Sequence, residues 1–383
     1  MNHLDELFFS IYIEKIEKKG EDAKPLIAIN DTSILLGVFD GLGGAGSIQK
    51  YKIDGHDDYK SGAYLASRAT YNIVEWFFHN YELDQFIEWE LDKKKFDLFN
   101  SFSLKKDKDY NKGINLSIKK FLGHLQNFLR EELQRQEEVH ADKDRVSKLK
   151  SKSVKLLPST MSLLYTADIQ GKKTIFSFWA GDSRSYKLDA SGLMQLTCDD
   201  IDEVDTSLES INSNAPMNNY INLSEKFHIN HDFFIENETK QILISSSDGA
   251  FGVFDTPILF ESAILSTLES SNSIKMWKSK LEVILKERQN DDISIIIYPI
   301  GFNDFDEIKQ FYKSRNKLLN QMIQKHINIE SDMKVMERQI DSLESVLNSK
   351  KRELEDMIVK EWDSYSQNYL KKLKHHYAEK RKE

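Results

Sequence analysis

Short apolar runs alternate with turns along the first 60 residues of the chain. These runs are rich in β-branched and aromatic residues, which favour strands. We therefore expect strands at residues 7–13, 25–29 and 34–39. Similar runs return later in the chain, at residues 160–169, 173–181, 183–188, 241–247 and 293–300. The pattern predicts two groups of strands with a long stretch between them.

Apolar residues recur every three or four positions in two parts of that stretch, residues 61–81 and 114–133. This spacing predicts two amphipathic helices. A further helical pattern, at residues 262–287, precedes the last strand. The charged segments at residues 104–113 and 134–145 predict loops or insertions. Strands, helices and more strands together predict one α+β unit that ends near residue 300.

The pattern changes after residue 303, where charged helix formers dominate and strand signals disappear. Apolar residues then keep a strict spacing of three and four, which is typical of a coiled coil. We call these positions the heptad seam, in which only His326 and Lys350 are polar: Leu319, Met322, His326, Ile329, Met333, Met336, Ile340, Leu343, Leu347, Lys350, Leu354 and Met357. The apolar side chains of such a helix must be buried against another helix, which could come from a second copy, from a partner protein or from the folded-back end of the same helix. We therefore predict two domains, residues 1–302 and a helical coiled-coil extension at residues 303–383.

The composition of the chain favours a globular protein and excludes several kinds of site. The chain has 383 residues, 40% of them apolar, which is enough for a sizeable core. The single cysteine, Cys198, excludes an internal disulfide or a cysteine-based zinc site, and it fits a reducing compartment. No uncharged apolar run reaches the roughly 20 residues that span a bilayer. We expect a soluble, cytoplasmic protein with no membrane partner, and the net charge of −9 disfavours nucleic-acid binding.

The segment LLGVFDGLGGAG, residues 35–46, contains the G-x-G-x-x-G pattern of a dinucleotide-binding turn. Asp40 stands directly before the first glycine, and its carboxylate would repel a pyrophosphate. The polar residues after Gly46 also do not predict the helix that this turn requires. We therefore favour the alternative that the glycines let the chain turn sharply behind a metal-binding aspartate.

Other acidic residues stand at the ends of other predicted strands. These residues are Glu21, Asp22, Asp182, Asp248, Asp291 and Asp292. Taken alone, each is more often a turn former than a ligand. Together they suit Mg²⁺ or Mn²⁺, which prefer oxygen ligands, and a pair of such ions can activate water for attack on phosphorus. The combination therefore predicts a metal site.

The segments around these residues resemble the PPM family of metal-dependent protein serine/threonine phosphatases, often called the PP2C type. Six blocks occur in the order of that family: GEDA, GVFDGLGG, PSTMSLLY, FWAGDSRSYKL with GLMQLTCDD, SSSDGAFGVF and NDDISIIIY. They span residues 11–300. The resemblance implies an α+β protein with a four-layer α/β/β/α sandwich, followed here by the long C-terminal extension.

By position in these blocks, the resemblance implies that Asp40 bridges two Mg²⁺ or Mn²⁺ ions. The carbonyl of Gly41 binds one ion, and Asp248 and Asp291 hold the other. The catalytic residues it implies are therefore Asp40, Asp248 and Asp291.

The resemblance also implies supporting acidic residues. Glu21 and Asp22 bind or orient metal waters, and Asp182 supports a third ion. A hydroxide that bridges the metals is the nucleophile, so no side chain becomes phosphorylated. The implied substrate is a phosphoprotein that carries phosphoserine or phosphothreonine.

Two positions depart from the family pattern. Leu42 stands where eukaryotic members often have a histidine that is proposed as general acid, and Glu17 replaces a phosphate-binding arginine. Lys15, Lys18 and Lys19 are the nearby cations that could substitute. These departures leave a second hypothesis, a weak or inactive pseudophosphatase that binds a partner. The retained acidic set favours the enzyme, because a scaffold needs no cluster of like charges.

Overall fold

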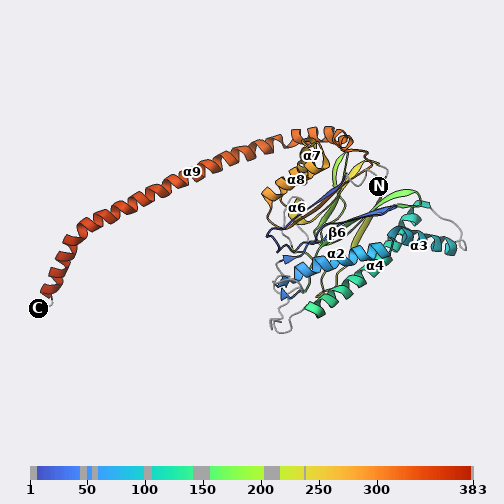
Figure 1. Ribbon diagram of the computed structural model, residues 1–383, viewed down its shortest axis with the longest axis horizontal. Coiled ribbons are helices and arrows are strands. Elements are labelled where there is room, and N and C mark those ends of the chain that lie inside the picture. Colours follow the sequence, from blue (N-terminus) through green and yellow to red (C-terminus); the bar gives the residue numbers. More distant parts are fainter. Residues whose placement is uncertain are drawn as a thin grey trace. The chain divides into compact units, whose positions relative to one another are not determined.

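The computed structural model describes most of the chain in two antiparallel sheets with helices on either side (Figure 1). The described residues are 7–43, 50–53, 59–98, 106–140, 156–201, 216–236 and 239–380. Sheet A has the strand order β1 (Phe9–Ile13), β12 (Ile293–Ile300), β11 (Gln241–Ser246), β8 (Arg184–Asp189) and β9 (Gly192–Gln195). Sheet B has the order β10 (Asn230–Ile235), β7 (Lys172–Ala180), β6 (Met161–Ile169), β3 (Ser33–Val38) and β2 (Leu26–Ile29).

Alternation along strand β3 explains how the two sheets stack. Successive side chains of a strand point to opposite faces. Leu36 and Val38 belong to the core between the sheets, together with Leu243 and Ile296 of sheet A. Leu35 belongs instead to the core beneath the helices of sheet B. Both faces of β3 are therefore covered.

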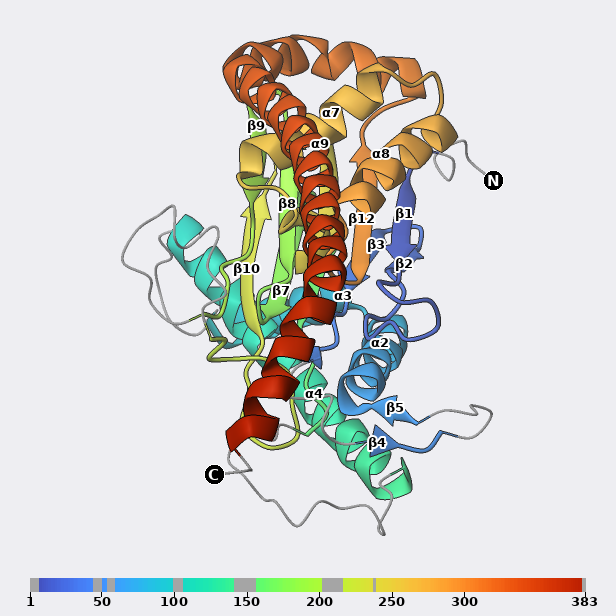
Figure 2. The ribbon, with the colours of Figure 1, turned by 90° about the vertical axis from the view of Figure 1, so that its left-hand side faces the viewer.

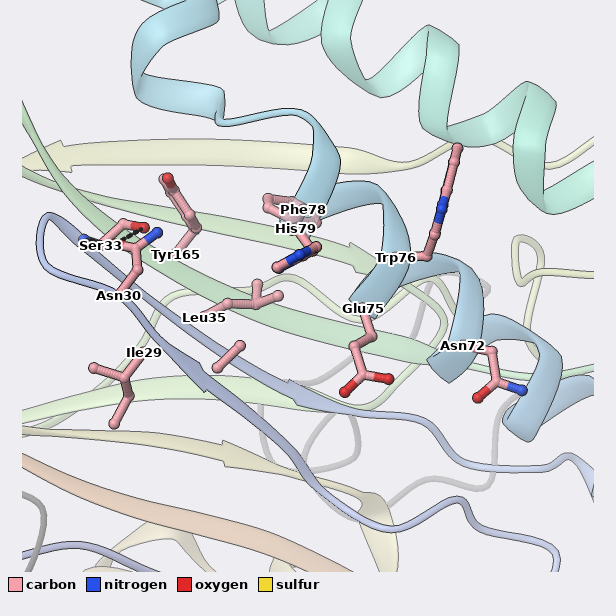
Figure 3. A pocket seen from close by; sticks show the side chains of 11 residues that line it. Ile29, Asn30, Ser33, Leu35, Asn72, Glu75, Trp76, Phe78, His79 and Tyr165 are labelled. Atoms are coloured by element: carbon pink, nitrogen blue, oxygen red, sulfur yellow. Dashed lines mark hydrogen bonds between the residues drawn. The ribbon is translucent and has the colours of Figure 1, made fainter.

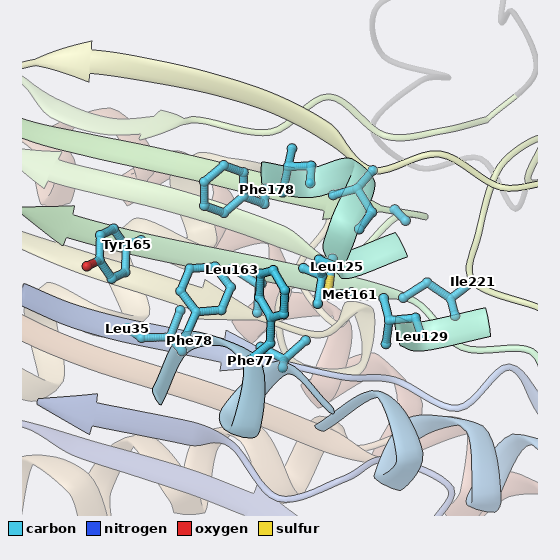
Figure 4. Close-up of a cluster of buried hydrophobic side chains, with 14 of the residues drawn as sticks. Leu35, Phe77, Phe78, Leu125, Leu129, Met161, Leu163, Tyr165, Phe178 and Ile221 are labelled. Carbon is cyan, nitrogen blue, oxygen red and sulfur yellow. The ribbon is translucent and has the colours of Figure 1, made fainter. Parts of the chain in front are cut away.

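Three helices cover sheet B: α2 (Gly62–Asn80), α3 (Leu83–Leu98) and α4 (Lys106–His140). Figure 4 shows Phe77 and Phe78 of α2 and Leu125 of α4 against Leu163 and Phe178 of the sheet. Each of these five side chains is less than a tenth exposed. Burial of an apolar side chain of this size stabilises the fold by about 1.5–3 kcal/mol.

A second set of helices covers sheet A, namely α7 (Pro257–Glu269), α8 (Ile274–Arg288) and the first turns of α9 (Phe305–Lys380). Trp277 and Leu281 of α8 are fully buried in this layer with Ile308 and Tyr312 of α9. Helix, sheet, sheet and helix thus form four layers, which confirms the predicted fold class. A short helix α6 (Asp248–Phe251) follows β11, and a hairpin of β4 (Lys50–Tyr51) and β5 (Lys60–Ser61) precedes α2.

The loop or insertion predicted at residues 104–113 is wrong from Lys106 onward, where α4 begins, and residues 104–105 lie outside the described part of the chain. The predicted loop at residues 134–145 is wrong as far as His140, where α4 ends, and residues 141–145 lie outside the described part of the chain. Lysine, glutamate, glutamine and arginine are good helix formers, so a charged segment can extend a helix whose centre is held by a core. Helix α3 and strand β10 were not predicted from the sequence.

The chain separates into two compact units, residues 1–319 and 320–383. Within the first unit, Tyr312 donates a hydrogen bond of 2.5 Å to the carbonyl of Leu188, and Arg315 pairs with Glu261 at 2.7 Å. The second unit consists of the rest of α9, which runs without reversal as far as Lys380. A folded-back hairpin is therefore absent from the described residues of the extension. No helix in these described ranges has the length and apolar character needed to cross a membrane.

Candidate metal centre

The predicted metal ligands stand where strands of both sheets end. Asp22 precedes β2 and Asp40 follows β3, both in sheet B. Asp182 lies in the turn between β7 and β8. Asp248 opens α6 directly after β11, and Asp291 precedes β12 in sheet A. Folding thus brings together carboxylates that are up to 269 positions apart in the sequence, from Asp22 to Asp291.

These carboxylates act on one another electrostatically. Burial, helped by the negative charge of Asp248, raises the pKa of Asp22 and of Asp182 to about 7. Burial also raises the pKa of Asp40 well above its usual range, with the charges of Asp22 and Asp248 adding to the effect. The pKa of Asp248 is raised by burial and by the charge of Asp291. The five groups therefore form one acidic cluster.

Unpaired oxygen atoms in the cluster fit a hard cation. Oδ2 of Asp22 and Oδ1 of Asp182 are buried and have no hydrogen-bond partner. A buried carboxylate oxygen without a partner is costly, and a divalent cation would satisfy it. The side chains of the cluster offer only oxygen donors, which Mg²⁺ and Mn²⁺ prefer. Across the described ranges, however, no three His, Cys, Asp or Glu side chains are already arranged to hold one ion.

The loop that carries Glu21 and Asp22 is tied down by Asp292. The Asp292 carboxylate is 7% exposed and accepts backbone N–H groups of Lys15 (2.7 Å), Glu21 (2.5 Å) and Asp22 (3.3 Å). Its neighbour Asp291 is exposed. The adjacent acids thus differ in role, since Asp292 organises the backbone and Asp291 adds its charge to that of Asp248.

Glu21 is held by the start of helix α2. Ser61, the N-cap of α2, donates a hydrogen bond to Oε1 of Glu21 and accepts one from the N–H of Tyr64 at 3.1 Å. Burial raises the pKa of Glu21, and the charge of Asp292 adds to this shift. The Ser61 contact opposes the shift, so it favours the charged form of Glu21.

Close approach to Glu21 explains two of the three glycines of the G-x-G-x-x-G pattern, Gly41 and Gly43. A Cβ atom on Gly41 would lie 2.5 Å from the carbonyl oxygen of Glu21, and one on Gly43 would lie 2.4 Å from its Oε2. The third glycine, Gly46, and the prediction that no helix follows it lie outside the described residues. The carbonyl of Asp40 accepts the N–H of Thr160 at 2.8 Å. The glycines therefore bring the end of β3 against the Glu21 loop.

A buried ion pair supports the turn at Asp182. Arg184 binds Asp199 with Nη2 at 2.5 Å and Nε at 2.9 Å. Asp200 accepts the N–H of Gly181 at 3.0 Å, and Gly181 has a φ of 103°, which favours glycine. Sequence reasoning did not give Arg184, Asp199 and Asp200 a role, although all three stand in the blocks that carry the family resemblance.

Arg68 was also missed. It projects from α2 and donates to the carbonyls of Gly20 (3.3 Å) and Glu21 (3.2 Å). Glu17, which stands where the family has its arginine, is exposed. The signal that could have revealed Arg68 is its position on the first predicted helix, seven residues after Ser61.

A cavity of about 460 Å³ lies apart from the cluster, between α2 and the strands β2 and β3 (Figure 3). Leu35, Trp76, His79 and Tyr165 are among its lining residues. None of the predicted metal ligands lines it.

Comparison with known proteins finds similarity to solved structures of serine/threonine phosphatases. No family model matches the sequence, and no curated protein matches it. The structure described as PppA, a key regulatory component of T6SS in Pseudomonas aeruginosa, is 17% identical, with 77% of this chain and 97% of that chain covered and a TM-score of 0.41. Serine/threonine phosphatase Stp1 from Staphylococcus aureus is 16% identical, with coverages of 77% and 95% and a TM-score of 0.45. The phosphatase PstP/Ppp of Mycobacterium tuberculosis is 11% identical, with coverages of 76% and 96% and a TM-score of 0.43. At these identities and TM-scores, the likeness by itself gives no evidence about the activity of this protein.

Proposed function

We propose that this protein is a Mg²⁺- or Mn²⁺-dependent phosphatase that hydrolyses phosphoserine and phosphothreonine in proteins. The observation that carries the proposal is the acidic cluster, in which strand ends of both sheets supply carboxylates with raised pKa values and with unpaired buried oxygens. Bound ions would supply positive charge that activates water and neutralises the phosphoryl oxygens.

Each predicted residue has a role in this proposal. Asp40, Asp248 and Asp291 would hold two ions, with the carbonyl of Gly41 as a further ligand. Three supporting residues would bind or orient water and a third ion: Glu21, Asp22 and Asp182. The charge of each carboxylate disfavours ionisation of the others, so cation binding would release protons from the cluster near neutral pH.

The test is release of phosphate from a phosphoserine peptide in the presence of Mn²⁺. Asp40→Asn and Asp248→Asn are expected to lower turnover by at least about 100-fold, because each removes a charge that would hold the cation. Asp168→Asn is the matched control, since Asp168 is exposed on β6. The absence of metal-dependent turnover above the two cluster variants would refute the proposal.

The second candidate is a pseudophosphatase that binds a partner. Glu17 in place of an arginine, Leu42 in place of a histidine, and the absence of a formed three-residue metal arrangement among the described residues favour it. Calorimetry separates the two candidates, because an enzyme of this class binds Mn²⁺ and the Asp40→Asn variant binds it more weakly. A wild-type protein that takes up no Mn²⁺ supports the pseudophosphatase.

We further propose that residues 1–302 form the phosphatase domain of a cytoplasmic protein, that residues 303–383 are its helical extension, and that residues 319–357 join two copies. Nine apolar side chains of the heptad seam are 53–68% exposed, and a second seam would cover them. The truncation that tests this ends at Leu319, because the first turns of α9 are buried in the first unit. Light scattering should show a dimer for the full chain and a monomer for residues 1–319. Equal association of the two would exclude dimerisation through the seam.

A further inference from the structure

Cationic side chains gather beside the loop that carries Glu21. In the hairpin before α2, Lys50 pairs with Ser61 and Tyr51 pairs with Lys60. Figure 2 shows this hairpin beside α2. Because Ser61 donates a hydrogen bond to Glu21, the hairpin brings its two lysines next to the Glu21 loop.

Tyr64 of helix α2 lies beside both Lys60 and Arg68. Lys60 donates to the carbonyl of Lys18 at 2.8 Å, and its ammonium lies 5.0 Å from the centre of the Tyr64 ring. Arg68 lies one turn beyond, with its guanidinium carbon 3.5 Å from the centre of the same ring. Tyr64 and Arg68 are four residues apart on α2, which places them on one face of that helix. A cation over an aromatic face is held in place by the ring's electrostatic field.

Lys50 stands beside Glu21 as well, because its strand partner Ser61 donates a hydrogen bond to Oε1 of Glu21. Lys50 is exposed, and so is Lys18. We call Lys18, Lys50, Lys60 and Arg68 the basic rim. These four cations stand on a chain whose net charge is −9.

The position of the rim suits the part of a substrate next to its phosphate. If the cluster and its cations take the phosphoryl group, the flanking residues of the substrate pass over the surface beside Glu21. Acidic flanking residues are attracted there and basic ones are repelled. Lys60 and Arg68 are already oriented by the Tyr64 ring and by loop carbonyls, so little side-chain freedom is lost when an anion approaches.

We propose that the basic rim selects phosphoprotein segments with acidic residues next to the phosphorylated side chain. This inference rests on the proposed phosphatase function, and it names the substrate class of the same site. The lysines of the rim determine specificity in this view and take no part in the chemical step.

The experiment compares two phosphoserine peptides of equal length in Mn²⁺, one with aspartate and glutamate flanks and one with alanine flanks. The readout is the ratio of their kcat/KM values, because a general loss of folding or of metal lowers both values together. The wild-type ratio is expected to favour the acidic peptide by roughly tenfold at low salt, and high salt should reduce it. Lys50→Glu and Lys60→Glu should each lower the ratio by roughly tenfold, since each replaces an attraction with a repulsion.

Lys275→Glu is the matched control, because Lys275 is exposed in the first turn of α8, on the other side of the molecule's sheets. It should leave the ratio unchanged. A wild-type ratio near one, or a ratio that the control lowers as much as the rim variants, overturns this inference and leaves the phosphatase proposal standing. A lack of turnover with both peptides overturns the proposed function, and this inference with it.

Discussion

Replacement of Asp292 by asparagine is expected to loosen the loop that carries Glu21 and Asp22. The Asp292 carboxylate is buried, with Oδ1 bound to the N–H of Lys15 and Oδ2 bound to the N–H groups of Glu21 and Asp22. Asparagine keeps one acceptor oxygen, and its amide nitrogen would face backbone donors at the other position. At least one backbone N–H would therefore lose its partner.

The magnitude follows from the bonds that are lost. A hydrogen bond to a charged group contributes about 1.5–3 kcal/mol, and an unsatisfied buried donor adds a cost of its own. For Asp292→Asn we expect the free energy of unfolding to fall by about 2–4 kcal/mol. Asp291→Asn is the control, because Asp291 is exposed and accepts only a local hydrogen bond from the N–H of Asp292 at 2.8 Å. Its expected effect is about 0.5 kcal/mol or less.

The assay is urea unfolding at pH 7 in the presence of EDTA, so that cation binding does not contribute. The midpoint should decrease for Asp292→Asn with an unchanged slope, which identifies a change of stability. Equal losses for the two variants would show that Asp292 does not organise the loop.

Two further predictions concern the same edge of the sheets. A Cβ atom on Gly249 would lie 1.8 Å from the carbonyl oxygen of Asp292, so Gly249→Ala should lower the free energy of unfolding in urea by about 3 kcal/mol or more. Gly123 on α4 is the control, because a Cβ atom there would have nothing within 4 Å. Gly123→Ala should therefore raise the free energy of unfolding by about 0.5–1 kcal/mol. A Gly249→Ala midpoint equal to that of the wild type would contradict the close approach. The pKa values of Asp22 and Asp182 are about 7 in the folded protein, above the ordinary value near 4. Between about pH 4 and 7 the folded state therefore binds more protons than the unfolded state. The free energy of unfolding of the metal-free protein should fall as pH rises over this range. Mg²⁺ should restore the loss at pH 7, and a metal-free midpoint that rises over this pH range would refute the electrostatic account.

The local pattern of the sequence was sufficient to predict most strands and the helices at residues 61–81 and 114–133. The apolar residues of these elements recur at a clear period, because one or both faces of each element are buried along its length. Helix α3 was missed although Leu83, Ile87 and Leu91 are buried at a spacing of four, because the many charged residues around them obscured the pattern. The ends of α4 were missed for a similar reason.

The acidic residues at strand ends were also readable from the sequence, since a turn after an apolar strand is a local feature. Residue type and strand position did not distinguish Asp291 from Asp292, and only the family resemblance singled out Asp291. The difference comes from backbone N–H groups of Lys15, Glu21 and Asp22, which stand at least 270 positions away and face only one of the two carboxylates. The role of Arg68 depends in the same way on carbonyls of a distant loop. Periodicity is a property of one segment, whereas burial of a charge and the partners of a carboxylate are properties of segments that meet only in the folded chain. The sequence by itself thus determined the layers and the chemistry available at their edge, and the tertiary structure decided which of those groups face one another.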